Sequence, residues 1–253
     1  MRLKQKRPLK LIKKAADSQS GSGKKLFVSC VIVAAGSSDR MGGQDKIFSE
    51  LDGMPVLAYS LRTLSSSSCI NELIVVTRRD KLEEAAGLCR LYAQNKAAGV
   101  VAGGKTRAES ALAGVMAASR KARLIAIHDG ARPLVTEEVI NEAVKKAAVC
   151  GAAVAAVPVI DTIKTVCDGK IEETPPRSGL FAAQTPQVFD AELIKAALTY
   201  TIEKGIAVTD DSEAVERLGF KPAVTAGDRQ NIKITVPEDL STALAIISRR
   251  NTK

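Results

Sequence analysis

An apolar run at Val31–Ala35 leads into a loop of small residues that carries two cations. The loop begins at Gly36 and contains Arg40, and Lys46 follows it. A buried strand that ends in such a loop presents unblocked backbone N–H groups to solvent at its carboxyl end. Arg and Lys supply the positive charge that binds a polyphosphate, and the small side chains leave room for a flat base. These residues predict a nucleotide site, which fits a nucleoside triphosphate better than a dinucleotide.

Two other nucleotide-binding patterns are absent from this loop. It reads Gly36-Ser37-Ser38-Asp39-Arg40-Met41, which lacks the glycine spacing G-x-G-x-x-G, and no Gly-Lys-Ser/Thr follows as a P-loop requires. Taken alone, the loop also fits an ordinary strand-to-helix turn with surface charges. The prediction therefore depends on which other segments reach the same place.

The composition favours an α/β core of small aliphatic side chains. Apolar residues make up 45% of the 253 residues, but aromatic residues only 3%. Such packing suits parallel strands covered by helices. The five cysteines form no C-x-x-C pair, and a single histidine accompanies them. A zinc cluster is therefore not expected, and the cysteines are interpreted as buried small hydrophobes in a reducing compartment.

The net charge of +9 lies almost entirely in the first 25 residues, which hold nine Lys or Arg and one Asp. We expect a basic, flexible tail over residues 1–25 and one folded domain over 26–253, with a linker at Ser20–Gly23. A nearly neutral domain argues against nucleic acid as a partner, although binding through the tail stays open. Neither a secretory leader nor a membrane span is expected, so a cytoplasmic location is predicted. The tail is basic and poor in acidic residues, so an organelle address also stays open, beside a bacterial extension or an expression remnant.

Strand-like and helix-like segments alternate from residue 28 onward. Strands are predicted at 28–35, 72–77, 99–102, 123–128 and 152–157, and helices at 55–64, 81–93, 106–119 and from 136. This order predicts a single-domain, doubly wound, mainly parallel sheet of Rossmann-like type. Ligands bind such sheets outside the carboxyl ends of the strands. The loops 36–46, 103–107 and 129–132 are therefore expected at one rim.

Residues 158–188 break this alternation. Asp161–Val166 is predicted to be extended, residues 167–170 a turn, and residues 171–174 the returning arm of a hairpin. This projecting β-arm, about residues 158–183, could pack on a neighbouring subunit or stand as an exposed flap. Beyond it, helices are predicted at 191–204, 210–218 and 237–250, and strands at 222–225 and 231–236.

Several segments, in the same order along the chain, resemble the family of 2-C-methyl-D-erythritol 4-phosphate cytidylyltransferases over about residues 28–250. They are Val33–Gly36 with Arg40 and Lys46, Gly103-Gly104 with Arg107 and Ser110, His128–Pro133, Asp161–Lys164, Gln184–Gln187, Thr209-Asp210 and Asn231–Thr235. The resemblance implies a reaction that joins CTP to 2-C-methyl-D-erythritol 4-phosphate and releases pyrophosphate, in the non-mevalonate isoprenoid pathway. Such a reaction needs positioning and cations more than an acid or a base. The sequence fits this chemistry, because it shows no nucleophilic Ser-His or Cys-His pairing.

The resemblance also assigns residues to roles. The triphosphate and transition-state cations would be Arg40, Lys46 and Lys233. CTP would lie against Ala34, Ala35, Gly36, Gly103, Gly104, Ser110 and Asp129. The methylerythritol phosphate would contact Asp129, Arg132, Thr162, Arg177, Thr185, Thr209 and Lys233. Mg²⁺ would be held mainly by the CTP phosphates, and the arm would cross to a partner subunit, so a homodimer is expected.

Some positions depart from the family pattern or leave alternatives open. Asp45-Lys46-Ile47 stands where Pro-Lys-Gln is common, Gly130 where alanine is usual, and Lys105 where an acidic residue is common. A ribitol-5-phosphate cytidylyltransferase resembles the first half, but residues 176–180 and 209–214 favour the methylerythritol enzyme. A non-catalytic nucleotide-binding regulator is the alternative outside the enzymes. His128, at the end of an apolar strand, is predicted to be structural rather than catalytic.

Overall fold

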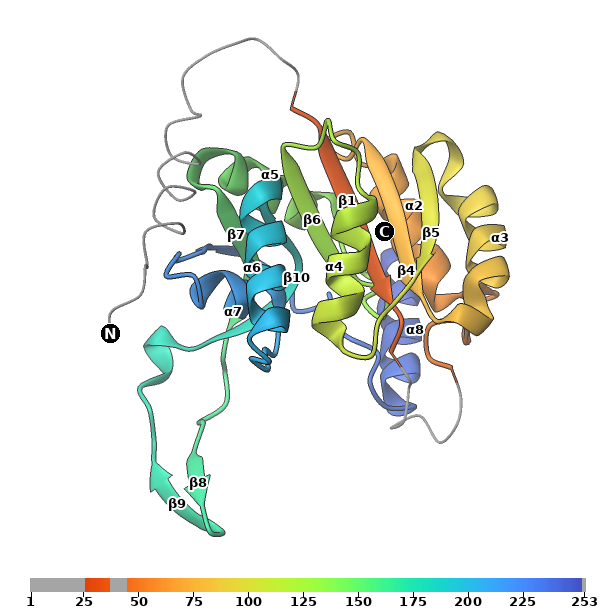
Figure 1. The fold of residues 1–253 in the computed structure, drawn as a ribbon. Helices are drawn as coiled ribbons and strands as arrows, with labels where there is room; N and C mark the ends of the chain where they lie inside the picture. Colours follow the sequence, from red (N-terminus) through yellow and green to blue (C-terminus); the bar gives the residue numbers. More distant parts are fainter. Residues whose placement is uncertain (1–25, 37–44, 252–253) are drawn as a thin grey trace, which may run out of the picture.

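The computed structural model describes residues 26–36 and 45–251. The predicted tail and Arg40 lie outside these ranges. The described chain forms a seven-stranded sheet in the order β11-β7-β10-β6-β1-β4-β5, with helices on both faces (Figure 1). The strands are β1 (Val28–Ala34), β4 (Glu72–Thr77), β5 (Ala97–Ala102), β6 (Leu124–Asp129), β7 (Ala152–Pro158), β10 (Phe181–Asp190) and β11 (Ala223–Ala226). Only β10 runs antiparallel to its neighbours, so the predicted mainly parallel, doubly wound sheet is confirmed.

Helices cover the sheet on both faces because its central strands are apolar on both. In β1, Cys30 and Ile32 belong to the cluster packed by α2 (Val56–Ser66), α3 (Leu82–Tyr92) and α5 (Glu137–Cys150). Val31 points the other way, into the cluster packed by α4 (Arg107–Ala117), α6 (Ala191–Glu203) and α7 (Asp211–Glu216). All three β1 side chains are fully buried. Period-two alternation therefore buries both faces, as expected for a parallel strand at the centre of a sheet.

Helix α4 lies close against the sheet and directs its N-terminus to the rim. A Cβ added at Gly114 would lie 2.3 Å from Val31 and 2.7 Å from Val76, so only glycine permits this approach. The helix begins at a capping box, in which Thr106 accepts from the Glu109 backbone and the Glu109 side chain accepts from Thr106. These contacts fix Arg107, the first residue of the helix.

The predicted β-arm is present as a hairpin that projects away from the sheet (Figure 1). It consists of β8 (Thr165–Cys167) and β9 (Lys170–Glu173), joined at Asp168 and Gly169, which both have positive φ. Ile160, Val166 and Ile171 expose more than half of their side chains. The arm therefore presents apolar surface that the rest of the described residues do not cover.

The structure differs from the sequence prediction at two segments of the C-terminal half. Residues 231–236 are not a strand. They dock on the loop after β6, where Ile234 N–H donates to Ala131 O at 2.8 Å, and on β10, where Asn231 Nδ2 donates to Thr185 O at 2.9 Å. Strand β10 was not predicted, because Pro186 cannot donate to a ladder. In the structure, Pro186 falls at an irregularity where β10 loses register with β7.

The remaining elements are a short hairpin, the C-terminal helix α8 and three 3₁₀ segments. The short hairpin of β2 (Glu50–Leu51) and β3 (Met54–Pro55) precedes α2, and α8 (Glu238–Asn251) packs on both. The 3₁₀ segments η2 (Arg79–Lys81), η3 (Gln94–Lys96) and η4 (Arg177–Gly179) join longer elements. Within the described ranges, no helix is both long and apolar enough to cross a bilayer.

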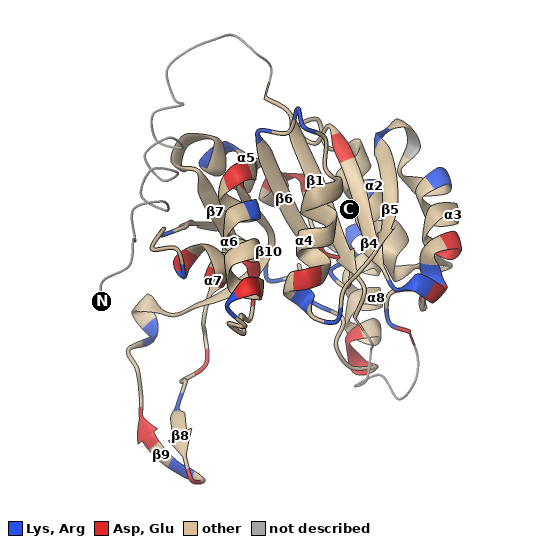
Figure 2. Ribbon diagram, viewed as in Figure 1, with Lys and Arg blue, Asp and Glu red and all other residues tan. Residues whose placement is uncertain are grey.

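The interpretation of the cysteines holds for some positions and is wrong for one. Cys30 and Cys89 are buried, and burial raises the pKa of the Cys89 thiol to about 11. Cys69 and Cys150 are half-buried, and Cys167 is exposed on the arm. Cys167 is not a core residue, because it lies on a hairpin whose side chains are exposed. Both signs of charge are spread over the helices and the arm (Figure 2).

Candidate active site

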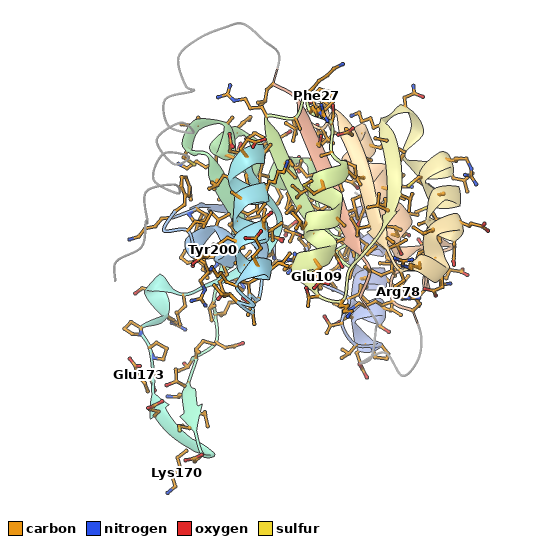
Figure 3. All side chains as sticks on the ribbon, viewed as in Figure 1. Phe27, Arg78, Glu109, Lys170, Glu173 and Tyr200 are labelled. Carbon is orange, nitrogen blue, oxygen red and sulfur yellow. The ribbon has the colours of Figure 1, made fainter. Side chains whose placement is uncertain are left out.

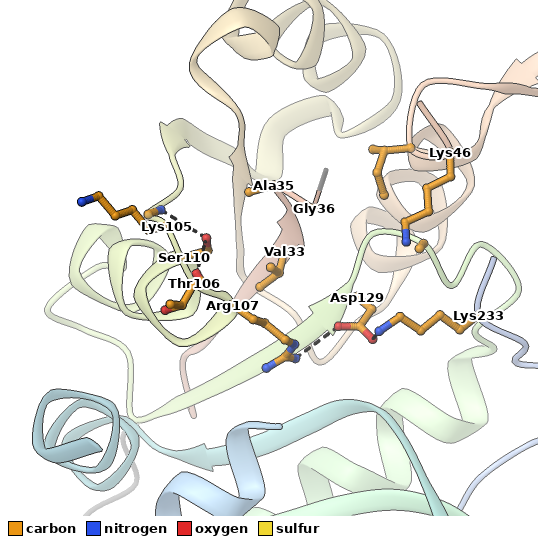
Figure 4. Close-up of a pocket in the computed structure, with 13 residues that line it drawn as sticks. Val33, Ala35, Gly36, Lys46, Lys105, Thr106, Arg107, Ser110, Asp129 and Lys233 are labelled. Atoms are coloured by element: carbon orange, nitrogen blue, oxygen red, sulfur yellow. Dashed lines mark hydrogen bonds and ion pairs between the residues drawn. The ribbon is translucent and has the colours of Figure 1, made fainter. Parts of the chain in front are cut away.

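A cavity of about 300 Å³ opens at the carboxyl ends of β1, β5 and β6. Figure 4 shows the residues that line it. They are Val33, Ala35, Gly36, Lys46, Ile47, Gly104, Lys105, Thr106, Arg107, Ser110, Asp129, Ala131 and Lys233. The described parts of the three predicted loops thus meet at one rim, because parallel strands bring their carboxyl ends together.

Asp129, the last residue of β6, is the electrostatic centre of the cavity. Its Oδ2 lies 2.8 Å from Lys233 Nζ and 3.8 Å from Arg132 Nε, and its Oδ1 lies 3.2 Å from Arg107 Nη2. Burial alone would raise the pKa of Asp129, but Arg107 and Lys233 hold it well below its usual range. The carboxylate is therefore ionised and orients the cations around it.

Arg107 and Asp211 form a contact that the sequence analysis did not predict. Arg107 Nη2 also donates to Asp211 Oδ2 at 2.7 Å, so one guanidinium joins α4, β6 and α7. Asp211 is fully buried, and burial raises its pKa although Arg107 opposes this. Arg107 was noted within a motif, but the two partners are 104 residues apart and no local pattern signals their contact.

The glycines after β5 allow a tight approach between three elements of the predicted base and ribose site. A Cβ on Gly103 would lie 2.6 Å from Ala35 Cβ and 2.7 Å from Ser110 Oγ. Ser110 Oγ donates to Thr106 O at 2.9 Å and accepts from Gly104 N–H at 3.2 Å. A side chain at either glycine would displace this wall of the cavity, because one on Gly104 would also meet Glu109 at 2.4 Å.

Two lysines from opposite ends of the chain point their ammonium groups into the cavity (Figure 4). Lys46 stands in the turn that begins at Asp45, and Lys233 stands in the segment that docks through Asn231 and Ile234. Lys233 keeps 39% of its side chain exposed although it pairs with Asp129. It can therefore meet a ligand without losing the carboxylate that orients it. Ala34, also predicted at the CTP site, does not line the cavity but is buried in the cluster packed by α2, α3 and α5.

Arg132 and Thr185 do not line the cavity but bond to the segments that carry its lining residues. Arg132 Nη1 donates to Asn231 O at 2.7 Å, and its side chain is only 12% exposed. Thr185 Oγ1 lies 3.0 Å from Asp129 N and 3.0 Å from His128 Nδ1. In this position Thr185 accepts from the Asp129 backbone and donates to the imidazole, so it orients Asp129.

His128 is structural, as predicted. It is fully buried, and its Nε2 lies 3.1 Å from Arg132 O, to which it donates when Nδ1 accepts from Thr185. Burial lowers the pKa of His128 to about 4. The imidazole is therefore neutral at pH 7 and does not serve as a proton donor there.

His128 is the only histidine of the chain, so its titration can be observed directly. We expect its imidazole NMR signals to stay constant from pH 8 to about pH 5, with a midpoint of about 4. The folded pKa lies below the unfolded value of about 6.5. The contribution of neutral His128 to the free energy of unfolding is thus fully present above pH ~6.5 and declines as the pH falls to about 4. A midpoint near 6.5 would contradict this interpretation.

Besides Arg132 and Thr185, three further residues of the predicted sugar-phosphate site do not line the cavity of a single chain. Thr162 is exposed on the arm, and Arg177 Nη1 donates to Ile160 O at 2.9 Å beside it. Thr209 is exposed, and its backbone and hydroxyl donate to Glu213. Arg40 cannot be placed, because it lies outside the described residues.

A divalent metal fits this cavity only as a companion of a ligand's phosphates. Among the described residues, no group of three or more His, Cys, Asp or Glu could hold a metal ion. Asp129 is the acidic residue that lines the cavity, and both its oxygens face cations. Mg²⁺ keeps several waters and takes phosphate oxygens readily, so this donor set agrees with a metal carried in on a triphosphate.

The fold and the cavity together define a class of enzyme. Cations surround one carboxylate at the carboxyl edge of a doubly wound sheet, and the lining residues include neither histidine nor cysteine. This arrangement suits transfer of a phosphate-bearing group by positioning and charge. It is the arrangement of a nucleotidyltransferase.

The comparisons with known proteins identify the family. The family model of 2-C-methyl-D-erythritol 4-phosphate cytidylyltransferase (IspD) matches residues 28–249. The chain is 46% identical over 219 residues to the cytidylyltransferase of that name from Caldanaerobacter subterraneus, covering 85% of this chain and 96% of the relative. It is 44% identical to that of Halalkalibacterium halodurans, covering 88% and 97%.

Solved structures support the same family assignment. The crystal structure of 4-diphosphocytidyl-2C-methyl-D-erythritol synthase from Anaerococcus prevotii superposes with a TM-score of 0.79 at 32% identity, covering 88% of this chain and 99% of that one. The chain therefore belongs to the 2-C-methyl-D-erythritol 4-phosphate cytidylyltransferase family. It is an enzyme of the nucleotidyltransferase class, and the family's reaction uses CTP and methylerythritol phosphate in isoprenoid biosynthesis. Nucleotidyltransferases of this kind generally depend on a divalent metal.

Proposed function

We propose that this chain joins CTP and 2-C-methyl-D-erythritol 4-phosphate through the cavity around Asp129. A phosphate oxygen of the sugar attacks the α-phosphorus of CTP, the new P–O bond forms, and the bond to the departing pyrophosphate breaks. The observation that carries the proposal is the pair of lysines, Lys46 and Lys233, that enter one cavity beside an ionised carboxylate. The sugar phosphate is largely deprotonated near pH 7, so no general base is required.

The residues have separate roles in this proposal. Lys46 and Lys233 neutralise charge that develops on the α-phosphate oxygens. Arg40, which stands between β1 and Lys46 in the sequence, contributes to the same role. Gly36, Ala35, Gly104 and Ser110 offer a small-residue wall for the base and ribose, supported by Ala34 and Gly103. Bound Mg²⁺ would add positive charge at the triphosphate, held mainly by phosphate oxygens.

The sugar side of the site requires a second copy of the chain. Thr162 and Arg177 lie on or beside the arm, which projects away from the cavity of its own chain. The arm exposes three apolar side chains, those of Ile160, Val166 and Ile171. We propose that the arm packs on a partner and brings these two residues to the partner's cavity, beside Arg132 and Thr209. A homodimer is then the active unit.

The first test measures pyrophosphate release from CTP and Mg²⁺ with two acceptors in parallel. We expect turnover with 2-C-methyl-D-erythritol 4-phosphate and none above background with ribitol 5-phosphate. Turnover with ribitol 5-phosphate alone would replace the proposed acceptor. CTP binding without turnover on either acceptor would indicate a nucleotide-binding regulator instead.

A further inference from the structure

Arg78 stands just beyond the carboxyl end of β4 and outside the cavity lining. Figure 3 shows Arg78 at the same end of the sheet as Glu109 of α4. Phe27, which precedes β1, lies at the other end. Its guanidinium holds three partners. Nη2 donates to Asp45 Oδ2 at 2.6 Å, Nη1 donates to Gly36 O at 3.3 Å, and Nε donates to Asp80 Oδ1 at 3.3 Å. One side chain thus holds both Gly36, after β1, and Asp45, before Lys46.

Asp45 in turn organises the residues around Lys46. Its Oδ1 accepts from Ile47 N–H at 3.1 Å, and its backbone oxygen accepts from Phe48 N–H at 3.1 Å and from Ser49 N–H at 2.7 Å. A side chain that bonds the backbone two residues further on is a common way to fix a turn. The carboxylate of Asp45 therefore serves two purposes: Oδ1 closes the turn, and Oδ2 ties it to Arg78.

Lys46 is held from both sides by this arrangement. On its C-terminal side, Ile47 is 2% exposed, and its oxygen accepts from Leu57 N–H at 3.0 Å. On its N-terminal side, the anchor is the ion pair of Asp45 with Arg78, whose side chains are only 19% and 28% exposed. When a guanidinium bonds to two carboxylates and a carbonyl, solvent weakens its ion pairs less than it weakens an isolated surface pair.

We propose that Arg78 is a positioning residue for the nucleotide reaction, acting through Asp45 to set the direction from which Lys46 enters the cavity. The inference rests on the proposed function, in which Lys46 contacts the CTP phosphates. Arg78 needs no contact with a substrate for this role. A small displacement of a catalytic group is enough to matter, since a misplacement of about 1 Å can reduce a rate by about 100-fold.

The test is a double-mutant cycle on the intact chain, with Arg78→Gln, Asp45→Asn and the combined variant. Asparagine keeps an oxygen that can accept from Ile47, so the turn is retained while the ion pair is lost. We expect each single variant to lower kcat/KM for CTP by about ten-fold and to leave KM for the sugar phosphate unchanged. The combined variant should be no worse than the poorer single variant, because both remove the same link.

Asp80→Asn is the matched control. Asp80 shares the same guanidinium, but it is 66% exposed and does not touch the turn. We expect its kcat/KM to stay within about two-fold of the wild type. Melting temperatures of all variants distinguish loss of Lys46 placement from general unfolding, which would lower the melting temperature and the apparent kcat for both substrates.

Three results would overturn the proposal. Losses that multiply in the combined variant would show that Arg78 acts on the ligand directly, and an equal loss in Asp80→Asn would show a general charge effect. Single variants at wild-type activity would remove any role for Arg78. Calorimetric CTP affinities of the same proteins, measured without the sugar phosphate, test the link separately. A wild type that binds CTP but releases no pyrophosphate would thus count against the proposed function alone.

Discussion

Replacing Lys233 with methionine is expected to lower kcat by about 100- to 1,000-fold, the range seen when one donor to a transition-state oxyanion is removed. Methionine keeps the length and apolar stem of the side chain but removes the ammonium group 2.8 Å from Asp129. The charge that builds on the α-phosphate then loses one of its cations. Steady-state pyrophosphate release, with CTP affinity measured by calorimetry, separates the loss in kcat from the loss in binding.

Lys145→Met is a suitable control for Lys233→Met. Lys145 is 73% exposed and pairs with Glu142 on the surface of α5. Its replacement removes one positive charge without changing the cavity, so activity should stay within about two-fold of the wild type. A Lys233→Met enzyme that also retained wild-type kcat would exclude Lys233 from the transition-state contacts.

Replacing Asp129 with asparagine is expected to impair both stability and activity. The carboxylate is 10% exposed and faces Lys233, Arg107 and Arg132. Removing one partner of a buried ionic cluster leaves the others uncompensated, which costs about 3–5 kcal/mol. The cations would also lose the group that orients them, so kcat should fall together with the free energy of unfolding.

The pH dependence of this effect gives an independent check. The folded pKa of Asp129 is lowered, so its stabilising contribution is present above the unfolded pKa of about 3.9 and is lost as the pH falls further. Denaturant unfolding at pH 7 and pH 3 should therefore show a smaller difference between wild type and Asp129→Asn at pH 3. Asp228→Asn, which weakens a half-exposed pair with Arg250, should change stability by less than about 1 kcal/mol. Equal losses in the two variants would contradict a central role for Asp129.

The N-terminal half of the fold follows closely from local sequence patterns. β4 occupies the predicted residues 72–77, and the helix predicted at 81–93 is found at Leu82–Tyr92. In this half each strand is a continuous apolar run followed by an amphipathic helix, so the two periods differ clearly. The strands and helices themselves can therefore be assigned with little information from distant residues, although β1 pairs with the distant β6.

The C-terminal half depends on contacts that no local pattern carries. Pro186 lies where β10 loses register with β7. Beside it, Gln184 donates to Asp228 O and Thr185 O accepts from Asn231, two partners far along the chain. Asn231–Val236 has the alternation of a strand, yet it forms no strand and docks on the loop after β6 and on Thr185 of β10. In both segments tertiary contacts override the local propensity.

The candidate site shows the same division. The convergence of the loops after β1, β5 and β6 could be predicted from topology alone. The contact of Arg107 with Asp211 could not, because it joins residues brought together only where α6 packs against both α4 and α7. Thr162 and Arg177 follow the arm away from the cavity of their own chain, and no local pattern signals that displacement.

The position of Lys233 has a consequence for how the enzyme becomes active during its synthesis. Every strand of the seven-stranded sheet precedes Asn231 in the chain, so the sheet can form before Lys233 has been added. Synthesis proceeds from the N-terminus, and early segments can begin to fold first. A nascent chain that stops at residue 230 would thus contain the strands and Asp129 but lack one of the cations of the cavity. Catalysis in this protein would begin only after Lys233 has been added and its segment has docked beside Asp129.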